Sequence, residues 1–121
     1  MAGVVWIPWY ATILRQDSFA AEVAQAAPIA LRYGATQYAV HRSRDDRYKI
    51  TQMAWFESKT QWYRYWEGPE MIEFRRRNSG RFQIPVVYVW HDELAAGALG
   101  PEVGLEEPTP EPEPAPTAAA S

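Results

Sequence analysis

Two histidines, His41 and His91, are the side chains of this sequence best suited to transfer a proton near neutral pH. Imidazole titrates close to neutrality, so both are candidate general acids or bases. Gln52 is a polar residue in an otherwise apolar stretch, and facing the interior it would need a partner or a ligand. We therefore treat His41, His91 and Gln52 as catalytic candidates. The alternative is that the histidines are independent surface or interface residues and that Gln52 pairs with neighbouring groups.

Other kinds of chemistry have no support in the sequence. The chain contains no cysteine, which excludes a disulfide framework and a thiolate metal site. Phosphate-binding glycine loops, zinc-protease motifs and serine nucleophile elbows are absent from the sequence. Asp92 follows His91 directly, and neighbours on a strand point to opposite faces, so this pair does not imply a dyad. We expect no metal site and no cofactor.

Aromatic residues make up 14% of the chain, and several recur at helical spacing. Trp62, Tyr65 and Trp66 occupy positions i, i+3 and i+4, which places them on one helical face. Packing in the core is the simplest interpretation. Buried indole and phenol groups need hydrogen-bond partners, however, and a cavity that admits a flat ligand or water would supply them. The candidate ligand-binding residues are all aromatic: Trp6, Tyr10, Trp55, Trp66 and Tyr88.

The elements that must position these residues include four strands. Residues 4–14 are rich in β-branched and aromatic side chains and predict a strand covered on both faces. Residues 35–43 and 47–58 are joined by a short polar turn and predict a hairpin. The stretch PVVYVWHDEL, which begins at Pro85, predicts the last strand.

A first helix is predicted after Asp17 or Ser18, either of which can cap it. Apolar residues recur there at helical spacing: Phe19, Val23, Ala26, Ala27, Ala30 and Leu31. Pro28 must kink or restart this helix, and Gly34 suits a left-handed cap at its end.

A second helix is predicted from Ser58, whose hydroxyl can cap it. Gly68 and Pro69 interrupt it. Glycine can end a segment in a conformation that other residues disfavour, and proline suits the first position of a new helix. We expect the break to turn three apolar side chains toward the sheet: Met71, Ile72 and Phe74.

The order strand, helix, strand, strand, helix, strand predicts an α+β, ferredoxin-like βαββαβ fold with a four-stranded antiparallel sheet. Both helices cover one face of such a sheet. The other face would carry large aromatic side chains, and a second copy of the sheet is an economical cover. His41 and His91 then fall on opposite edge strands, apart within one subunit but able to meet across a dimer.

Several short features resemble the middle of dimeric α+β barrel proteins of the antibiotic biosynthesis monooxygenase type. They are Gly34, Tyr38, Arg42-Ser43, Asp45-Asp46, Phe56-Glu57-Ser58, Gly68-Pro69 and Phe74. The resemblance implies a dimeric α+β barrel with a cavity between each sheet and its helices, used by some members for aromatic polyketides or haem. It also implies, for the oxygenase branch, catalysis without metal or flavin. The haem-degrading branch uses a histidine on the second helix, and residues 59–79 contain none.

The length and the charge distribution of the chain limit how it can be divided into domains. We expect one domain in residues 1–99 and a disordered, acidic, proline-rich tail in residues 100–121. Outside the tail, basic and acidic residues nearly balance, so nucleic-acid binding is not expected. Arg75 to Arg77 are interpreted as a solvated helix end, with nucleic-acid contact as the weaker alternative. No membrane span or signal peptide is recognisable, which favours a cytoplasmic protein.

Two functions remain open at this stage. The first is a small homodimer that binds an aromatic or apolar small molecule, with cofactor-independent monooxygenation as its chemistry if it is an enzyme. The second is a non-catalytic interaction or scaffold protein that uses the dimer as a rigid body and the acidic tail for docking.

Overall fold

One of the two central strands, β1 (Gly3–Tyr10), forms from the β-branched and aromatic residues that predicted it. The computed structural model describes residues 2–99. Its other strands are β2 (Gln37–Arg42), β3 (Lys49–Phe56) and β4 (Val89–Asp92). All neighbours in the sheet are antiparallel, in the order β2-β3-β1-β4. The predicted four-stranded, ferredoxin-like α+β fold is therefore confirmed, and β2 and β4 are its two edges.

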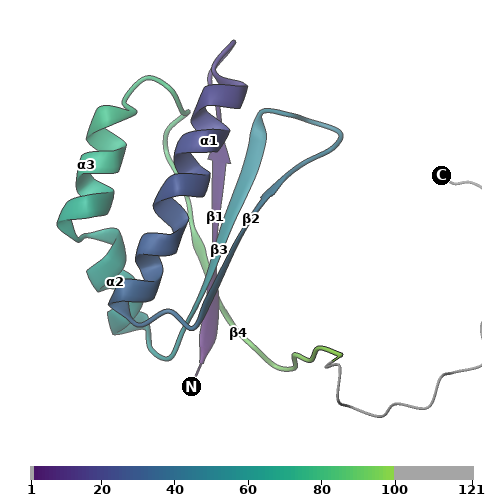
Figure 1. Cartoon of the computed structure of the whole chain (residues 1–121), viewed down its shortest axis with the longest axis vertical. Helices are drawn as coiled ribbons and strands as arrows, with labels where there is room; N and C mark the ends of the chain where they lie inside the picture. The colour runs from purple at the N-terminus through teal and green to yellow at the C-terminus, as the bar shows by residue number, and fades with distance from the viewer. Residues whose placement is uncertain (1, 100–121) are drawn as a thin grey trace, which may run out of the picture.

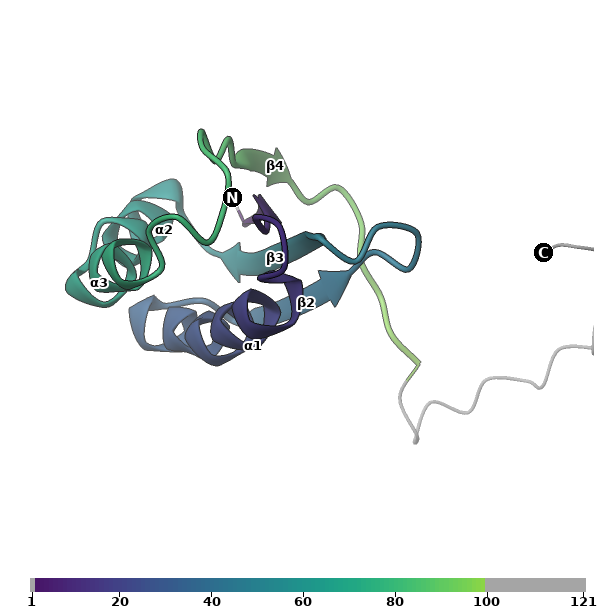
Figure 2. The same ribbon diagram turned by 90° about the horizontal axis from the view of Figure 1, so that it is seen from above.

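The helices lie together on one face of this sheet (Figures 1 and 2). They are α1 (Gln16–Ala26), the 3₁₀ helix η1 (Ala27–Tyr33), α2 (Lys59–Trp66) and α3 (Pro69–Arg77). In β1, the side chains of Val5, Ile7 and Trp9 have no exposed surface and point toward these helices. Trp6 and Tyr10 point the other way and keep 47% and 38% of their surface exposed. We call this second side of the sheet the open face.

The first helix differs from its prediction at both ends. It begins at Gln16, two residues earlier than a cap at Asp17 would place it and three earlier than a cap at Ser18, and no side chain caps it. At Ala27 the chain tightens into η1, which changes the angular spacing of the side chains. Leu31, expected on the apolar face, is consequently 47% exposed. The left-handed cap at Gly34 is confirmed by its φ of 104°.

The second helix begins as predicted, because Ser58 and Gln61 form a reciprocal capping box. Pro69 is the first residue of α3, as predicted. The reason for glycine at position 68 was wrong, since its φ of −75° is open to any residue. A Cβ atom there would instead lie 2.6 Å from the Arg64 carbonyl oxygen and 2.9 Å from the Tyr33 hydroxyl. The break therefore requires glycine for close packing.

Two further expectations need correction. Met71 and Phe74 are buried beneath α3, but Ile72 is 47% exposed because it lies off their helical face. The last strand is shorter than predicted and spans Val89–Asp92. Val89 pairs with Trp6, so the uncertain parity of this strand is settled: Val89 lies on the open face.

Within residues 2–99, no helix is long and apolar enough to cross a membrane. The predicted tail, residues 100–121, lies outside the described residues.

Candidate functional site

A chain of hydrogen bonds crosses the core between the sheet and the helices. Trp9 Nε1 donates to Gln52 Oε1 at 2.9 Å, and Gln52 Nε2 donates to the Tyr65 hydroxyl at 2.9 Å. The Tyr65 hydroxyl donates in turn to the Ala26 carbonyl oxygen at 3.2 Å. Gln52 is completely buried. Its amide therefore has the partners that a buried polar group requires and ties β3 to β1 and α2.

Tyr65 is held neutral by this environment. Burial raises the pKa of Tyr65 to about 12, because the interior disfavours the tyrosinate. Its hydroxyl thus remains a hydrogen-bond donor to the end of α1 at any physiological pH.

A cluster of rings at the junction of α2 and α3 contains one cation, and we call Trp62, Trp66, Arg75 and Tyr88 the Trp66 cluster. Trp66 stacks on Trp62 with ring centroids 5.1 Å apart. Tyr88 meets Trp62 edge-on, with centroids 4.9 Å apart. The Arg75 guanidinium lies over the Trp66 ring, 4.1 Å from its centroid. This contact joins the two helices across the break at Gly68, since Trp66 ends α2 and Arg75 belongs to α3.

Two buried nitrogen atoms in this cluster lack a hydrogen-bond partner within residues 2–99: Trp62 Nε1 and Arg75 Nη1. The Trp62 indole lies near the Tyr88 hydroxyl, but without the geometry of a hydrogen bond. Arg75 Nη2 has only a long ion pair, 4.0 Å from Glu67 Oε1. Burial lowers the pKa of Arg75, although arginine stays charged at neutral pH. Both nitrogen atoms can therefore donate a hydrogen bond to an oxygen atom of a ligand.

The register of the sheet orders the open face into cross-strand rows. One row contains Gln37, Trp55, Val4 and His91, the next Ala39, Met53, Trp6 and Val89, and a third His41, Thr51 and Pro8. Large apolar side chains occupy the middle of this surface, and the two histidines lie at its opposite edges. Three strand spacings and four residues separate the histidines, or roughly 20 Å. They do not meet within one protomer, as expected.

His91 packs against Trp6, with ring centroids 4.9 Å apart. Its Nδ1 atom is buried and has no hydrogen-bond partner among the described residues. Nearby on the same face, Trp55 Nε1 donates to Glu93 Oε1 at 2.7 Å. The open face therefore carries both an apolar centre and polar groups that a covering surface could contact.

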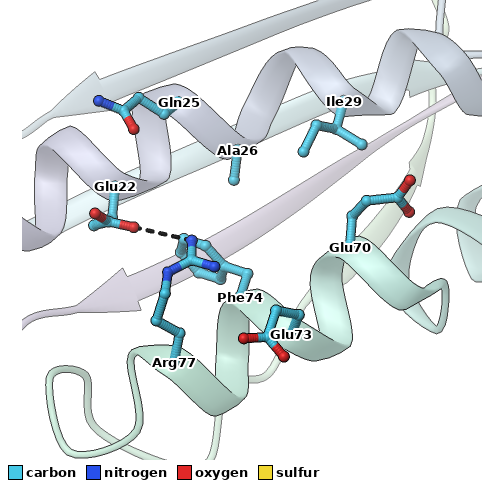
Figure 3. A pocket seen from close by; sticks show the side chains of 8 residues that line it. All are labelled: Glu22, Gln25, Ala26, Ile29, Glu70, Glu73, Phe74 and Arg77. Carbon is cyan, nitrogen blue, oxygen red and sulfur yellow. Dashed lines mark hydrogen bonds and ion pairs between the residues drawn. The ribbon is translucent and has the colours of Figure 1, made fainter.

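A groove of about 290 Å³ lies between α1 and α3. Figure 3 shows the side chains that line it. Its apolar floor includes Ala26 and Phe74, and an ion pair of 3.1 Å joins Glu22 to Arg77 across it. The other acids of its rim are also engaged. Glu73 pairs with Arg76, and Glu70 accepts a hydrogen bond from Tyr33, which lowers the pKa of Glu70. The Glu22–Arg77 pair links α1 to α3, and the Tyr33–Glu70 hydrogen bond links η1 to α3.

The structure divides the five predicted ligand-binding residues between two surfaces. Trp6, Tyr10 and Trp55 lie on the open face, whereas Trp66 and Tyr88 lie on the helix side. The two groups therefore lie on opposite sides of the sheet within one protomer, and the ligand-binding assignment of these residues stays a prediction.

Sequence reasoning missed Arg75, which it assigned to a solvated helix end with its two neighbours. The described contacts separate the three, because Arg76 and Arg77 pair with Glu73 and Glu22 while Arg75 covers Trp66. A signal was present in the sequence. Met71 and Arg75 are spaced i and i+4, so Arg75 lies on the buried face of α3.

A comparison with protein-family models finds no match to this chain, and a comparison with curated proteins finds no significant match. Solved structures do match. A proposed antibiotic biosynthesis monooxygenase from Nitrosomonas europaea superposes with a TM-score of 0.70 at 13% identity, covering 77% of this chain and 90% of that one. Another from Bordetella bronchiseptica has a TM-score of 0.67 at 21% identity, covering 78% and 98%.

A third similar structure is SnoaB from Streptomyces nogalater, described as a cofactor-independent oxygenase. Its TM-score is 0.66 at 11% identity, covering 78% of this chain and 95% of that one. At such identities the likeness concerns the fold. The chain thus has the fold of antibiotic biosynthesis monooxygenase-like proteins, as the resemblance implied.

Proposed function

We propose that the protein is a homodimer that binds an aromatic or otherwise apolar small molecule at the Trp66 cluster. The observation that carries the proposal is the pair of buried, unpaired donors, Trp62 Nε1 and Arg75 Nη1, beside stacked indole rings. An aromatic ligand suits these ring-rich surroundings, and an oxygen substituent suits the donors. This is also the side of the sheet on which the resemblance implies a cavity.

The charge of Arg75 favours one class of ligand. A cation that is partly buried over an indole stabilises an anion beside it more strongly than it would in water. We therefore expect a phenol, enol or carboxylic acid that binds in its ionised form. Trp62 supplies a second, neutral donor to the same molecule.

The chemistry we propose for such a ligand is monooxygenation without a cofactor, by analogy with the similar SnoaB. An ionised phenol or enol is electron-rich and can itself reduce dioxygen. One oxygen atom enters the organic molecule, and the other leaves as water together with two hydrogens of the substrate. In this reaction the protein orients the molecule and stabilises its anion through Arg75.

The second copy is proposed to cover the open face. Met53 and Trp6 lie at the centre of a surface that would otherwise leave several large apolar side chains in contact with water. Burial of such a surface is the main favourable contribution to protein association. The edge histidines, His41 and His91, remain candidates for acid or base chemistry at the margins of this interface.

Ligand binding is tested with two probes that share a ring system, 2-naphthoate and naphthalene. We expect the carboxylate to bind more tightly and to quench tryptophan fluorescence. Arg75→Met should weaken 2-naphthoate roughly tenfold or more, the loss typical of a charged hydrogen bond, and leave naphthalene little changed. Arg76→Met, an exposed neighbour on the same helix, is the matched control. Equal affinity of Arg75→Met and the unmodified protein for 2-naphthoate would contradict the assignment.

Dimerisation is tested independently by sedimentation over a range of concentrations. Met53→Glu places a charge at the centre of the open face and should yield monomers. Tyr63→Glu changes a half-exposed ring on the helix side and should leave the dimer intact. Monomeric unmodified protein at all concentrations would rule out the proposed interface.

A further inference from the structure

A second groove, at the end of the sheet where β1 finishes, lies apart from the Trp66 cluster. Its volume is about 320 Å³, and it is lined by Tyr10, Ala11, Ile13, Tyr48 and Gln83. We call it the tyrosine groove. Neither the ligand site nor the centre of the open face uses it.

The two rings of the tyrosine groove are held in fixed positions. Tyr10 and Tyr48 stack with centroids 6.3 Å apart and an angle of 25° between their planes. The Tyr10 hydroxyl donates to Asp46, and the Tyr48 hydroxyl accepts from the Leu14 amide at 3.3 Å. Preordered rings lose little conformational entropy when a partner binds, which favours this surface as a docking platform.

An exposed apolar turn adjoins the rings. Ile13 and Leu14 are 76% and 81% exposed, and Leu14 adopts a left-handed φ of 66°. This backbone conformation is unfavourable for a residue that carries a side chain, and glycine would avoid the strain. The chain thus holds two aliphatic side chains outward at the rim of an aromatic groove.

The surroundings of the tyrosine groove are cationic. The segments 10–17, 42–49 and 80–83 contain six basic side chains and three acidic ones. The basic ones are Arg15, Arg42, Arg44, Arg47, Lys49 and Arg81. Asp17 pairs with Arg42 and Arg47, and Asp46 is engaged by Tyr10. The excess of positive charge favours an acidic partner.

We propose that the tyrosine groove binds the acidic, proline-rich stretch of this same chain, residues 107–116, with the sequence EPTPEPEPAP. Proline-rich segments favour a polyproline II conformation and dock on aromatic-lined grooves, because their rings pack flat against tyrosine. Glutamate between the prolines can pair with the surrounding arginine and lysine. The apolar groove with its stacked rings suits the prolines of this stretch. The basic rim suits its glutamates.

The chain between β4 and residues 107–116 is long enough to reach the tyrosine groove. β4 ends opposite Gly3 and the groove lies beside Tyr10, so the sheet separates them by about 24 Å along the strands. Residues 93–110 can span about 55 Å in an extended polyproline conformation. A tether of this kind gives an effective concentration in the millimolar range, so even weak docking is populated. The stretch of the same protomer or of a partner can therefore reach the groove.

The test uses the full chain and a spin label on a single introduced cysteine, Ala118→Cys, which is unique because the chain has no other. We expect the amide signals of Tyr10, Ile13 and Tyr48 to lose most of their intensity at low salt. The loss should diminish toward 1 M salt, where the screening length falls to about 3 Å. Mixing labelled and isotope-enriched chains shows from which protomer the stretch comes, and either origin supports docking.

The double variant Arg47→Glu, Lys49→Glu reverses charge beside the groove and should restore these signals in full. Lys59→Glu, Arg64→Glu makes the same charge change on α2 and should leave the intensity loss as it was. Signal loss that is spread evenly over the domain, or that survives reversal at Arg47 and Lys49, would overturn the proposal. Docking within one protomer requires neither the ligand nor the dimer, so failure of this test and failure of the proposed function are distinguishable.

Discussion

Gln52 illustrates how one polar residue in an apolar strand can organise a core. Its amide accepts from Trp9 and donates to Tyr65, so three elements share one network. The sequence predicted that Gln52 would need a partner if it faced inward, and the structure supplies two. Its catalytic assignment remains a prediction, and the hydrogen bonds already made by its amide favour a structural role.

Replacing Gln52 should therefore affect stability first. Gln52→Leu leaves Trp9 Nε1 buried without an acceptor, and we expect unfolding free energy to fall by about 1–3 kcal/mol. Urea denaturation measures the change. Thr51→Val, on the opposite side of the same strand, is the control and should change stability by less than about 0.5 kcal/mol. Equal effects of the two variants would show that the network contributes nothing.

Tyr65 predicts how stability responds to alkaline pH. Its pKa is about 12 in the folded protein against 10.0 for the ordinary group, so folding favours the protonated form. The contribution is complete below pH 10 and is lost as pH rises toward 12, an amount of about 3 kcal/mol. Denaturation of the unmodified protein and of Tyr65→Phe at several pH values isolates this term. A Tyr65→Phe variant that loses the same stability over this interval would contradict the burial argument.

For single residues, the sequence predicted the chemical character of important side chains better than the contacts that they make. Helical spacing placed Trp62, Tyr65 and Trp66 on one face correctly. Arg75 was assigned by its charged neighbours, whereas its position relative to Met71 decides its burial. Tyr48 was overlooked because its role depends on Tyr10, which is close only in the folded sheet.

At the scale of elements, the break between α2 and α3 determines where the Trp66 cluster forms. Gly68 lets the chain pass close to Tyr33 and to the Arg64 carbonyl oxygen, and Pro69 then starts α3. The returning helix carries Arg75 onto Trp66. The Gly68-Pro69 dipeptide predicted where the helix breaks. It did not predict the steric reason for glycine, because the crowding at this position involves η1.

Gly68→Ala should accordingly disturb both stability and the cluster. The new methyl group would lie 2.6 Å from a backbone oxygen, a contact that must be relieved by moving α3. We expect a loss of about 1–3 kcal/mol, as for overpacked cores, together with a changed tryptophan fluorescence spectrum. Gly97→Ala, which meets nothing within 4 Å, should be neutral. A Gly68→Ala variant as stable as Gly97→Ala would refute the steric account.

Strand order and helix order were predictable from hydrophobic periodicity and turn residues. The ends of elements were less so. Pro85 was included in the last strand, yet pairing begins at Val89, since side-chain pattern does not reveal which backbone groups find partners. The sequence also left undetermined which alternate side chains of the last strand point to the open face. This choice decides whether Val89 or Tyr88 lies there.

At the scale of the whole molecule, the two faces of the sheet have different proposed roles. The helix side contains the Trp66 cluster with its unpaired donors, and the open face presents Trp6, Met53 and Val89 across adjacent strands. A ligand would supply partners for the unpaired donors of the helix side, and another protomer would cover the open face. The fold shared with SnoaB and other similar structures is compatible with both.

Native mass spectrometry of protein purified gently from its own source tests this account most directly, because one spectrum reports subunit number and any retained small molecule. We predict a dimer that carries an aromatic acid or phenol, and a dimer of Arg75→Met that has lost it. Oxygen uptake on adding the released compound would then identify a substrate. A monomer, or a dimer whose bound compound is retained in full by Arg75→Met, would contradict the central claim.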